Sequence, residues 1–569
     1  MTKDPTTELA PGAGNPQAAA GPVSPGGGGR QWFGHPAGLS TLFFTELWER
    51  FSYYGMRGIL ILYMAAAVAE GGLDFSDGKA AAIYGMYTGF VYLLALPGGW
   101  VADNIWGQRK SVFVGGCVIA AGHFTMALPM LGLPEQPMFF SGLILIVVGT
   151  GLLKPNVSTI VGELYPEGGA RRDAGFSVFY MGINLGAFFG PLICGWLGEN
   201  VNWHWGFSAA GFGMVLGLIQ YKLGERNLGE AGLLSSGDSP EIVSAKARNF
   251  YLVSAVAAGL AVVFAFLATS GVIALSLQTV ATWLGYSILL LVILFFAYLI
   301  MGVAWAAGFA VLFGIAVAYF NGTAGELAGQ YAIAVTLGVF IVANLILLGA
   351  QRGVITMEKR RLMVIFWLFL LAALFWSGFE QAGSSLNLFA ERETDRMMFG
   401  WEMPASWLQS INPLFIITLA PVFGALWIWL ARRNANPSIP VKFALGLLGL
   451  AAGFFVISWG AANTGEGALA APVWLIVTYF LHTCGELCLS PVGLSSITKL
   501  APRDRVGQMM GIWFIAAALG NLIAGLLAGQ LENLESQALF AQVAMIVGIG
   551  GLVALLLSPF VRKLMGNVE

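Results

Sequence analysis

The chain has 569 residues, of which 57% are apolar, 10% are charged and 76 are glycine. Soluble globular domains carry roughly 25% charged residues, so this composition excludes a water-soluble protein. The mean hydropathy of +0.76, together with apolar segments of about twenty residues that recur along the chain, predicts an all-helical polytopic membrane protein.

Enzyme chemistry is not expected. The longest polar segments, residues 1–36 and about 222–248, are far shorter than the ~100 residues of a typical catalytic domain. A nucleophile elbow, a phosphate-binding loop and zinc-ligand spacing are absent from the sequence. We therefore predict no catalytic residue, no metal site and no nucleic-acid partner. The four cysteines lie in apolar stretches, where a free thiol behaves as a small apolar group: Cys117, Cys194, Cys484 and Cys488.

Along the chain, residues 1–36 form a tail that is rich in Gly, Pro and Ala and is expected to be disordered and cytoplasmic. A first six-helix bundle is predicted over residues 37–222, a linker with inserted extra helices over 223–350, and a second six-helix bundle over 351–569. The first bundle's spans are predicted at 38–67, 80–101, 110–132, 138–161, 174–197 and 203–222. The second bundle's spans are predicted at 361–381, 406–430, 441–461, 471–492, 506–529 and 536–560.

The inserted segment leaves its number of spans open. Its middle stretch has only a weak break near Gly302, so two or four spans are both compatible with the sequence. If both termini are cytoplasmic, most of the 28 basic residues fall in cytoplasmic loops. An odd number of inserted spans would place the basic loops of the second bundle outside, so we expect an even number. Apolar runs lie near 249–270, 280–301, 302–320 and 328–349.

Two six-span halves with cytoplasmic ends predict a transporter whose substrate cavity lies between the halves near the bilayer midplane. The loop after the second span supports this prediction. Its pattern Gly99-x-x-x-Asp103-x-x-x-Gly107-Gln108-Arg109-Lys110 resembles the cytoplasmic loop of the major facilitator superfamily. There, glycines permit a tight turn and the charges lock neighbouring helix ends.

Seven ionisable side chains lie inside predicted spans, where each costs ~2.5–3.5 kcal/mol at the centre of a helix. Four are in the first span. At about 100° per residue, Glu46, Glu49, Arg50 and Arg57 share one stripe with Tyr53, so this stripe is expected to face protein or a cavity. The i,i+4 pair of Glu46 and Arg50 is also compatible with a purely structural ion-pair network. Arg57 has no carboxylate within one turn on its own helix.

The other three intramembrane charges are Lys154, Glu380 and Glu486. Lys154 precedes Pro155, which frees a backbone carbonyl, and such irregularity is tolerated where a cavity or a neighbouring helix supplies a partner. Glu380 and Glu486 need partners from other helices. Four carboxylates face three bases, so one negative charge is uncompensated. A carboxylate that alternates between paired and unpaired states can take up and release a proton.

Two segments of the chain resemble the signatures of the proton-dependent oligopeptide transporters, a branch of the major facilitator superfamily. Residues 46–55, ELWERFSYYG, resemble the first signature, and residues 179–186, FYMGINLG, resemble the second. Three further segments stand in the order expected of this family: 149–156, GTGLLKPN; 379–381, FEQ; and 485–491, GELCLSP.

The resemblance implies import of di- and tripeptides by alternating access, with protons as the coupling ion and no other cofactor. It implies that Arg57 and Lys154 hold the peptide carboxylate, while Glu486, with Asn184 and Asn412, holds the ammonium group. It also implies a bacterial cytoplasmic membrane protein that contacts the lipid bilayer and functions as a monomer.

Further roles follow from the same resemblance. Tyr53 and Tyr92 are expected to supply hydroxyls, and Trp513 is expected to form an apolar pocket wall. An Arg57 to Glu380 pair is expected to close the outer side and a Lys154 to Glu486 pair to steady the inner side, each breaking in one conformation. The residues assigned to proton coupling and gating are Glu46, Glu49, Arg50 and Glu380.

Two departures from the family and several alternatives stay open. Bacterial members usually have two extra helices between the halves, whereas the insert of this chain has up to four apolar runs. Animal members carry a histidine in the second span where this chain has Gly85, so proton handling here is expected to rest on carboxylates. The nearest alternative function is proton-coupled transport of another anion or a small drug-like solute on the same fold. A channel and a membrane-embedded sensor are alternatives from other classes.

Overall fold

The structure is a computed structural model that describes residues 31–234, 237–269, 276–350, 355–463, 468–566 and 568. Within these residues, 13 helices are long and apolar enough to cross a membrane. The only strands in this part of the chain are two hairpins of two-residue strands. The chain is therefore an all-helical multi-pass membrane protein, as its composition predicts.

The long helices fall into three groups along the chain. The first group is α1 Gly38–Ala65, α2 Asp77–Leu93, α3 Ala95–Val101 with the π-helix η2 Ala102–Trp106, α4 Gln108–Ala127, α5 Glu135–Glu163, α6 Gly169–Asn200 and α7 Trp203–Gly224. The inserted group is α8 Pro240–Thr269, α9 Leu277–Met301, α10 Val303–Ala324 and α11 Ala328–Ala350. The last group is α12 Met357–Phe379, α13 Ser385–Arg392, α14 Ile411–Arg432, α15 Ile439–Ala462, α16 Val473–Leu500, α17 Val506–Ala528 and α18 Ser536–Met565.

Short elements connect these helices. The strands are β1 Gln31–Trp32, paired with β2 His35–Pro36, and β3 Met397–Met398, paired with β4 Trp401–Glu402. The 3-10 turns are η1 Val68–Glu70, η3 Leu128–Leu131, η4 Glu225–Leu228, η5 Gly325–Leu327, η6 Glu380–Gly383, η7 Ala405–Ser410 and η8 Gly529–Glu532.

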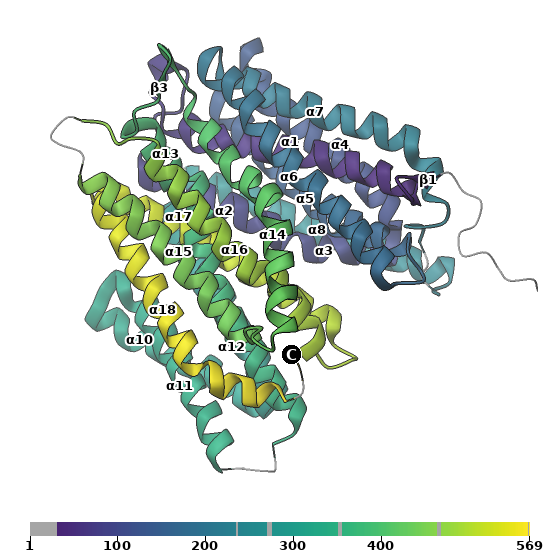
Figure 1. Ribbon diagram of the computed structural model, residues 1–569, viewed down its shortest axis with the longest axis vertical. Coiled ribbons are helices and arrows are strands. Elements are labelled where there is room, and N and C mark those ends of the chain that lie inside the picture. The colour runs from purple at the N-terminus through teal and green to yellow at the C-terminus, as the bar shows by residue number, and fades with distance from the viewer. Residues whose placement is uncertain are drawn as a thin grey trace, which may run out of the picture.

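The two main groups of helices converge at one end and separate toward the other (Figure 1). We call the first the convergent end; it is formed by residues 58–77, 192–204 and 380–410. Across the boundary between the groups, α2 packs on α17 and α6 packs on α14. These helix pairs therefore carry much of the contact between the two halves.

Helix α1 lies at the centre of the first half, where it packs against α6 and α7. Most of its residues are buried, on every face of the helix. It is not among the 13 span candidates because it carries four ionised side chains in 28 residues. A helix with that many charges is stable in a membrane only when other helices shield it from lipid.

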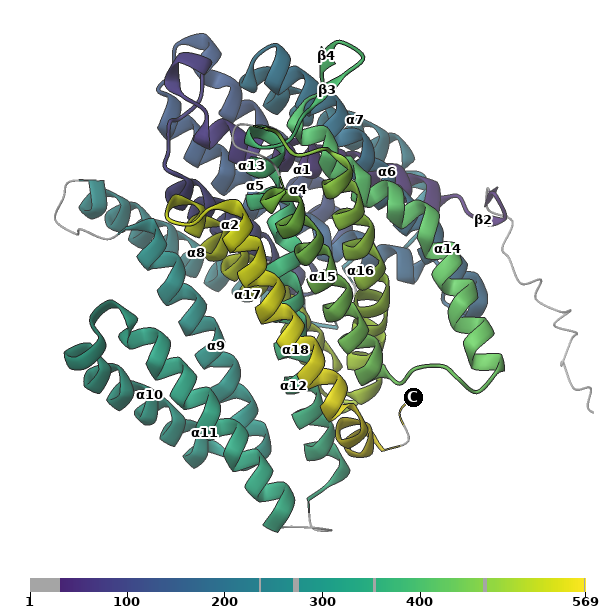
Figure 2. The same cartoon turned by 60° about the vertical axis from the view of Figure 1, so that its left-hand side comes forward.

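The inserted segment forms four helices, α8 to α11, and α9 ends at Gly302 (φ 102°), where the sequence has only a weak break. Three of them, α9, α10 and α11, are long and apolar enough to span a membrane. Helix α9 packs against α2, α12 and α17, whereas α10 and α11 pack mainly on each other and on α9. Figures 1 and 2 show α10 and α11 at the edge of the molecule, away from the boundary between the halves.

The N-terminal segment differs from the prediction. Residues 1–30 of the expected disordered tail lie outside the described residues, but residues 31–36 form the β1–β2 hairpin. Trp32 packs against Phe43 of α1, and His35 Nδ1 is 2.8 Å from the Tyr165 hydroxyl. Burial raises the pKa of Tyr165 to about 12, so this hydroxyl keeps its proton at neutral pH. The contacts of Trp32 and His35 therefore order residues 31–36, which composition alone predicts to be disordered.

The loop between η2 and α4 has the turn that its glycine pattern predicts. Gly107 has φ 75°, a left-handed conformation that other residues adopt at a cost. The Gln108 amide donates to Asp103 Oδ1 at 2.9 Å, and the guanidinium of Arg109 donates to the carbonyls of Ala231 and Gly229. The charged loop thus fastens the first bundle to the linker that follows it.

Candidate functional site

The charges of α1 form a buried cluster. Arg50 Nε is 2.7 Å from Glu46 Oε1 and 2.9 Å from Glu49 Oε2, so one guanidinium faces two carboxylates. The i,i+4 spacing brings Glu46 and Arg50 together on one face of the helix. In the described part of the chain, neither oxygen of Glu49 accepts a hydrogen bond, and Glu46 Oε2 accepts none. The cluster thus contains buried carboxylate oxygens that accept no hydrogen bond from the described residues.

A second ion pair joins the two halves at the convergent end. Arg57 Nη2 of α1 is 2.6 Å from Glu380 Oε2, and both side chains are buried, with 6% and 4% of their surfaces exposed. The predicted span 361–381 includes Glu380, whereas in the structure Glu380 lies just after the end of α12. The helix ends at Phe379, and Glu380 begins the 3-10 turn η6. This turn aims its carboxylate at α1 from the other half.

Tyrosines surround Arg57. Its Nε donates a hydrogen bond to the hydroxyl of Tyr84 on α2, and its guanidinium lies 5.5 Å from the Tyr54 ring centre. Tyr53, which was predicted to supply a hydroxyl, is instead buried against Tyr87 and lies beneath Arg50. Tyr53 and Tyr54 precede Arg57 by four and three residues, so helical spacing places both on its side of α1, and the Tyr54 ring is the one that the guanidinium contacts.

Lys154 of α5 is half-buried, and its Nζ lies 3.8 Å from the centre of the Tyr92 ring. Pro155 lies inside the helix, and the Asn156 amide donates to the carbonyls of Leu152 and Gly98, tying α5 to α3. Lys154 is within electrostatic range of Glu46, Glu49 and Glu380. However, among the described residues no carboxylate lies at ion-pair distance from it.

Glu486 of α16 faces the first half without a cationic partner among the described residues. Its Oε2 is 3.4 Å from Asn412 Nδ2, and the same amide donates to the Thr483 hydroxyl at 2.9 Å. Asn412 is the second residue of α14, so the start of that helix positions it. The predicted pair of Lys154 and Glu486 is not formed in this structure.

Several of these polar side chains are only half-buried although they lie between closely packed helices. They come from both halves: Tyr54, Tyr92 and Lys154 from the first, Asn412 and Glu486 from the second. By contrast, the side chains that close the convergent end, Arg57 and Glu380 among them, are buried. These half-buried side chains therefore keep part of their surface exposed, unlike the ion pair of Arg57 and Glu380.

Two predicted residues do not join this group in the structure. The Asn184 amide donates to the Tyr180 carbonyl within α6 at 2.9 Å, a bond that asparagine readily makes inside helices. Trp513 of α17 is buried and packs edge-on against Phe443 of α15, with ring centres 6.4 Å apart. Tyr180, which the sequence analysis did not single out, lies within electrostatic range of Glu486.

The convergent end contains further links between the halves that the sequence did not reveal. The Glu199 carboxylate at the end of α6 accepts hydrogen bonds from the Ala405 amide at 2.7 Å, the Ser406 amide at 3.1 Å and the Ser406 hydroxyl at 2.5 Å. Arg392 binds Asp77 through two hydrogen bonds of 2.7 and 2.9 Å. These contacts join residues more than 200 positions apart, and sequence spacing gives no signal for them.

At Gly85, where animal family members carry a histidine, close helix packing leaves no room for a side chain. Gly85 packs against Gly525 of α17, and a Cβ on Gly85 would lie 2.9 Å from the Gly525 Cα. A side chain at this position would push α2 and α17 apart. The position therefore serves close helix packing across the halves.

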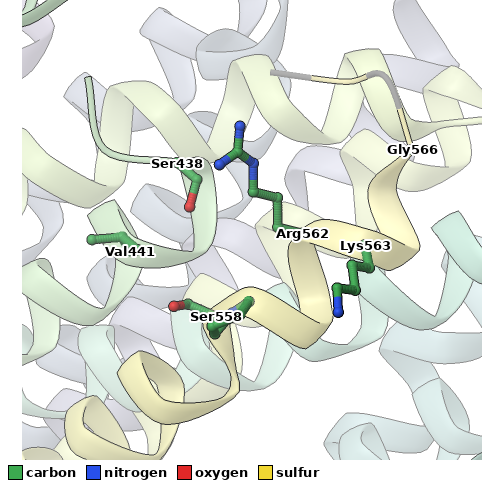
Figure 3. A pocket seen from close by; sticks show the side chains of 7 residues that line it. Ser438, Val441, Ser558, Arg562, Lys563 and Gly566 are labelled. Atoms are coloured by element: carbon green, nitrogen blue, oxygen red, sulfur yellow. The ribbon is translucent and has the colours of Figure 1, made fainter. Parts of the chain in front are cut away.

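A pocket of about 740 Å³ lies away from this site, at the distal end of α15 and α18. Figure 3 shows its lining, including Ser438 near the start of α15 and Arg562 and Lys563 of α18. Of the described residues that line it, none is among the predicted site residues. A second pocket, of about 420 Å³, lies at the convergent end beside Asp77 and Arg392.

Comparisons with known proteins agree with this geometry. Residues 109–252 and 334–563 match the POT family. The peptide transporter YePEPT of Yersinia enterocolitica is 42% identical over 95% of this chain and 98% of its own. A di-/tripeptide transporter of Lactococcus lactis subsp. cremoris is 34% identical over 95% of this chain and 98% of its own.

Solved structures extend the similarity to the fold. The crystal structure of a peptide transporter POT in complex with sulfate superimposes with a TM-score of 0.76 at 37% identity, over 95% of this chain and 97% of that one. A POT family transporter in complex with 5-aminolevulinic acid superimposes with a TM-score of 0.75 at 32% identity, over 94% and 98% of the two chains.

Proposed function

This chain belongs to the POT family, and from that premise we propose that it imports di- and tripeptides together with protons by alternating access. It is a multi-pass transporter with the major facilitator fold and not an enzyme. One observation carries the proposal. Lys154 and Glu486 come from opposite halves, both are only half-buried, and neither has an ion-pair partner among the described residues. A zwitterionic peptide offers a partner of the correct sign to each.

Peptide recognition follows from these two charges. The peptide carboxylate pairs with Lys154, and Arg57 joins it when it is released from Glu380. The ammonium group pairs with Glu486, to which Asn412 already donates a hydrogen bond. Tyr54 and Tyr92 lie beside the two bases and supply hydroxyls to the peptide backbone. Asn184 and Trp513 join the site only if α6 and α17 move, which alternating access allows.

Gating rests on the pair of Arg57 and Glu380. In this structure the pair is made and the halves meet at the convergent end, which we assign to the outer side of the membrane. Protonation of Glu380 removes the negative charge that holds Arg57, so the outer end can open. Arg57 is then available to the incoming peptide. The predicted pair of Lys154 and Glu486 forms in the opposite conformation, when the inner ends of the halves close.

Proton coupling also involves the α1 cluster. Glu46 and Glu49 share Arg50, and their unsatisfied oxygens favour uptake of one proton by the cluster. Lys154 is within electrostatic range of both carboxylates, so its charge and the proton occupancy of the cluster depend on each other. A peptide carboxylate that binds Lys154 thereby favours protonation of the cluster.

In the cell, we place the protein in the cytoplasmic membrane of a bacterium, with both termini inside and one chain as the functional unit. The basic loops predicted by sequence support this orientation. Two six-helix halves in one chain supply both sides of the site, so a second copy is not required.

Transport by purified protein in liposomes tests the function. With an inward-directed acid gradient, labelled dialanine is expected to accumulate above its external concentration, and a protonophore is expected to abolish this accumulation. A channel would only equilibrate the peptide, and a sensor would bind it without uptake. Either of those results would overturn the proposal.

A further inference from the structure

Three side chains meet at the convergent end of the first half, away from the residues assigned to peptide or proton transport above. Tyr63 near the end of α1 donates a hydrogen bond to Glu135 Oε1 at the start of α5. His204 Nε2 at the start of α7 lies 3.1 Å from the same oxygen. His204 and Tyr63 are buried, whereas the side chain of Glu135 is 37% exposed.

The second ring nitrogen of His204 fixes where protons must be. Nδ1 lies 2.9 Å from the backbone carbonyl of Met126. A carbonyl oxygen only accepts hydrogen bonds, so Nδ1 must carry a proton. In a neutral imidazole, Nε2 would then have a lone pair, and it would face the carboxylate oxygen of Glu135. Two acceptors at 3.1 Å repel each other unless a proton lies between them.

Tyr63 indicates which partner carries this additional proton. Its hydroxyl donates to Glu135 Oε1, the same oxygen that faces the imidazole. A hydrogen bond donated to a carboxylate favours its ionised form. Glu135 is also partly exposed to water, which stabilises its charge. The additional proton therefore belongs to His204, as an imidazolium between two acceptors.

We propose that Tyr63, Glu135 and His204 form a proton-binding site at the convergent end, distinct from the central ion pairs. The bound proton lies between the His204 imidazole of α7 and the Glu135 carboxylate of α5, to which Tyr63 of α1 also donates. The Nδ1 proton joins α7 to the Met126 carbonyl of α4 in either protonation state. The site goes beyond the proposed function because none of its residues takes part in peptide binding or in the gate.

The surroundings of His204 contain few competing charges. Among the described residues, Glu135 of α5 and Tyr63 of α1 are the titratable groups in contact with its ring, and α4 supplies the Met126 carbonyl. From η1, Glu70 presents its backbone carbonyl to the neighbouring Trp203 indole.

Nitrogen-15 NMR of the full-length protein tests the proposal, because the chain has only four histidines. At about pH 7, where a free imidazole is mostly neutral, we expect both ring nitrogens of His204 to show one-bond coupling to a proton. In Glu135→Gln, the amide N–H can donate to Nε2, so only Nδ1 should carry a proton at the same pH. His204→Gln assigns the signals.

Two controls accompany the measurement. His35 contacts a hydroxyl, that of Tyr165, and not a carboxylate, so it is an internal reference that Glu135→Gln should leave unchanged. Glu167→Gln removes an exposed carboxylate and should leave His204 protonated on both nitrogens. A neutral His204 in the wild-type protein, or an imidazolium that persists in Glu135→Gln, would overturn the proposal.

Discussion

The guanidinium of Arg57 and the carboxylate of Glu380 lie 2.6 Å apart and come from opposite halves of the molecule. Both are buried, so each is held in a place where an unpaired charge is costly. Lys154 and Glu486, deeper between the halves, have no such partner among the described residues. The contrast between a buried ion pair at the convergent end and two charges without an ion-pair partner underlies the predictions below.

Glu380→Gln should uncouple transport from protons. The amide keeps the shape of the carboxylate but cannot be ionised, so Arg57 is released at every pH. We expect peptide accumulation under an acid gradient to fall about tenfold or more, which corresponds to at least ~1.4 kcal/mol, while exchange of internal for external peptide continues. Uptake by the wild-type protein should rise as the outer pH falls, whereas that of the variant should not.

The control for this variant is Glu402→Gln, which removes a mostly exposed carboxylate on the same side of the molecule. It should transport like the wild-type protein. Full acid-stimulated accumulation by Glu380→Gln would show that this carboxylate is not the gate.

Lys154→Gln should weaken recognition of the peptide carboxylate. Loss of one member of a buried charge pair costs about 2–5 kcal/mol of binding, so the affinity for dialanine should fall by 30-fold or more, as ~1.4 kcal/mol corresponds to tenfold. Competition binding with dialanine and its C-terminal amide measures this effect. The wild-type protein should prefer the free acid strongly, and the variant should bind both alike. Lys246→Gln, near the start of α8, is the control, and a preference that survives Lys154→Gln would place the carboxylate elsewhere.

Glu199→Gln should loosen the outer end without touching the peptide site. Its carboxylate accepts three hydrogen bonds from Ala405 and Ser406 in the other half. Hydrogen bonds to a charged group contribute about 1.5–3 kcal/mol, so the population open to the outside should rise about tenfold. Spin-label distances between the outer ends of α6 and α14 report this population. Ser406→Ala removes one bond of the three and should have a smaller effect; equal distances in all three proteins would exclude a latch.

Gly107→Ala should destabilise the protein at the loop after η2. A left-handed conformation costs a non-glycine residue about 1–2 kcal/mol, and Gly107 has φ 75°. Thermal unfolding in detergent should show a lower midpoint. Gly338→Ala, at a helical position with open space around it, should leave the midpoint unchanged or raise it. Equal midpoints for Gly107→Ala and the wild-type protein would show that the turn tolerates a side chain.

Features set by a single helix could be predicted from the sequence. The pairing of Glu46 with Arg50 follows from helical spacing, and the turn at Gly107 follows from its glycine pattern. The two groups of six helices follow from hydropathy. The span predicted at 361–381 lies within the structure's span Met357–Arg392, but hydropathy could not predict that Glu380 begins a 3-10 turn after α12.

Features set by the register between helices could not be predicted. Tyr84 meets Arg57 only because α1 and α2 pack at a particular height, and Glu199 meets Ser406 only because the halves have closed. Family resemblance supplied the candidates for the peptide site, but not the contacts among them.

The central claim is that the outer ends of the two halves separate in every transport cycle. Gly58 of α1 and Ser406 of η7 allow a direct test, because a Cβ on Gly58 would lie 3.6 Å from the Ser406 Cβ. Disulfides have Cβ separations of about 3.5–4.5 Å. The double variant Gly58→Cys and Ser406→Cys, with Cys194→Ala to remove a nearby thiol, should therefore form a bond that locks the outer end.

Dialanine uptake by this locked protein in liposomes, before and after reduction, is the decisive measurement. We predict that the oxidised protein does not accumulate peptide and that a reductant restores transport, while the Cys194→Ala parent is unaffected by either treatment. Uptake at the parent's rate with the disulfide intact would contradict the account, since peptide would then cross without the halves parting.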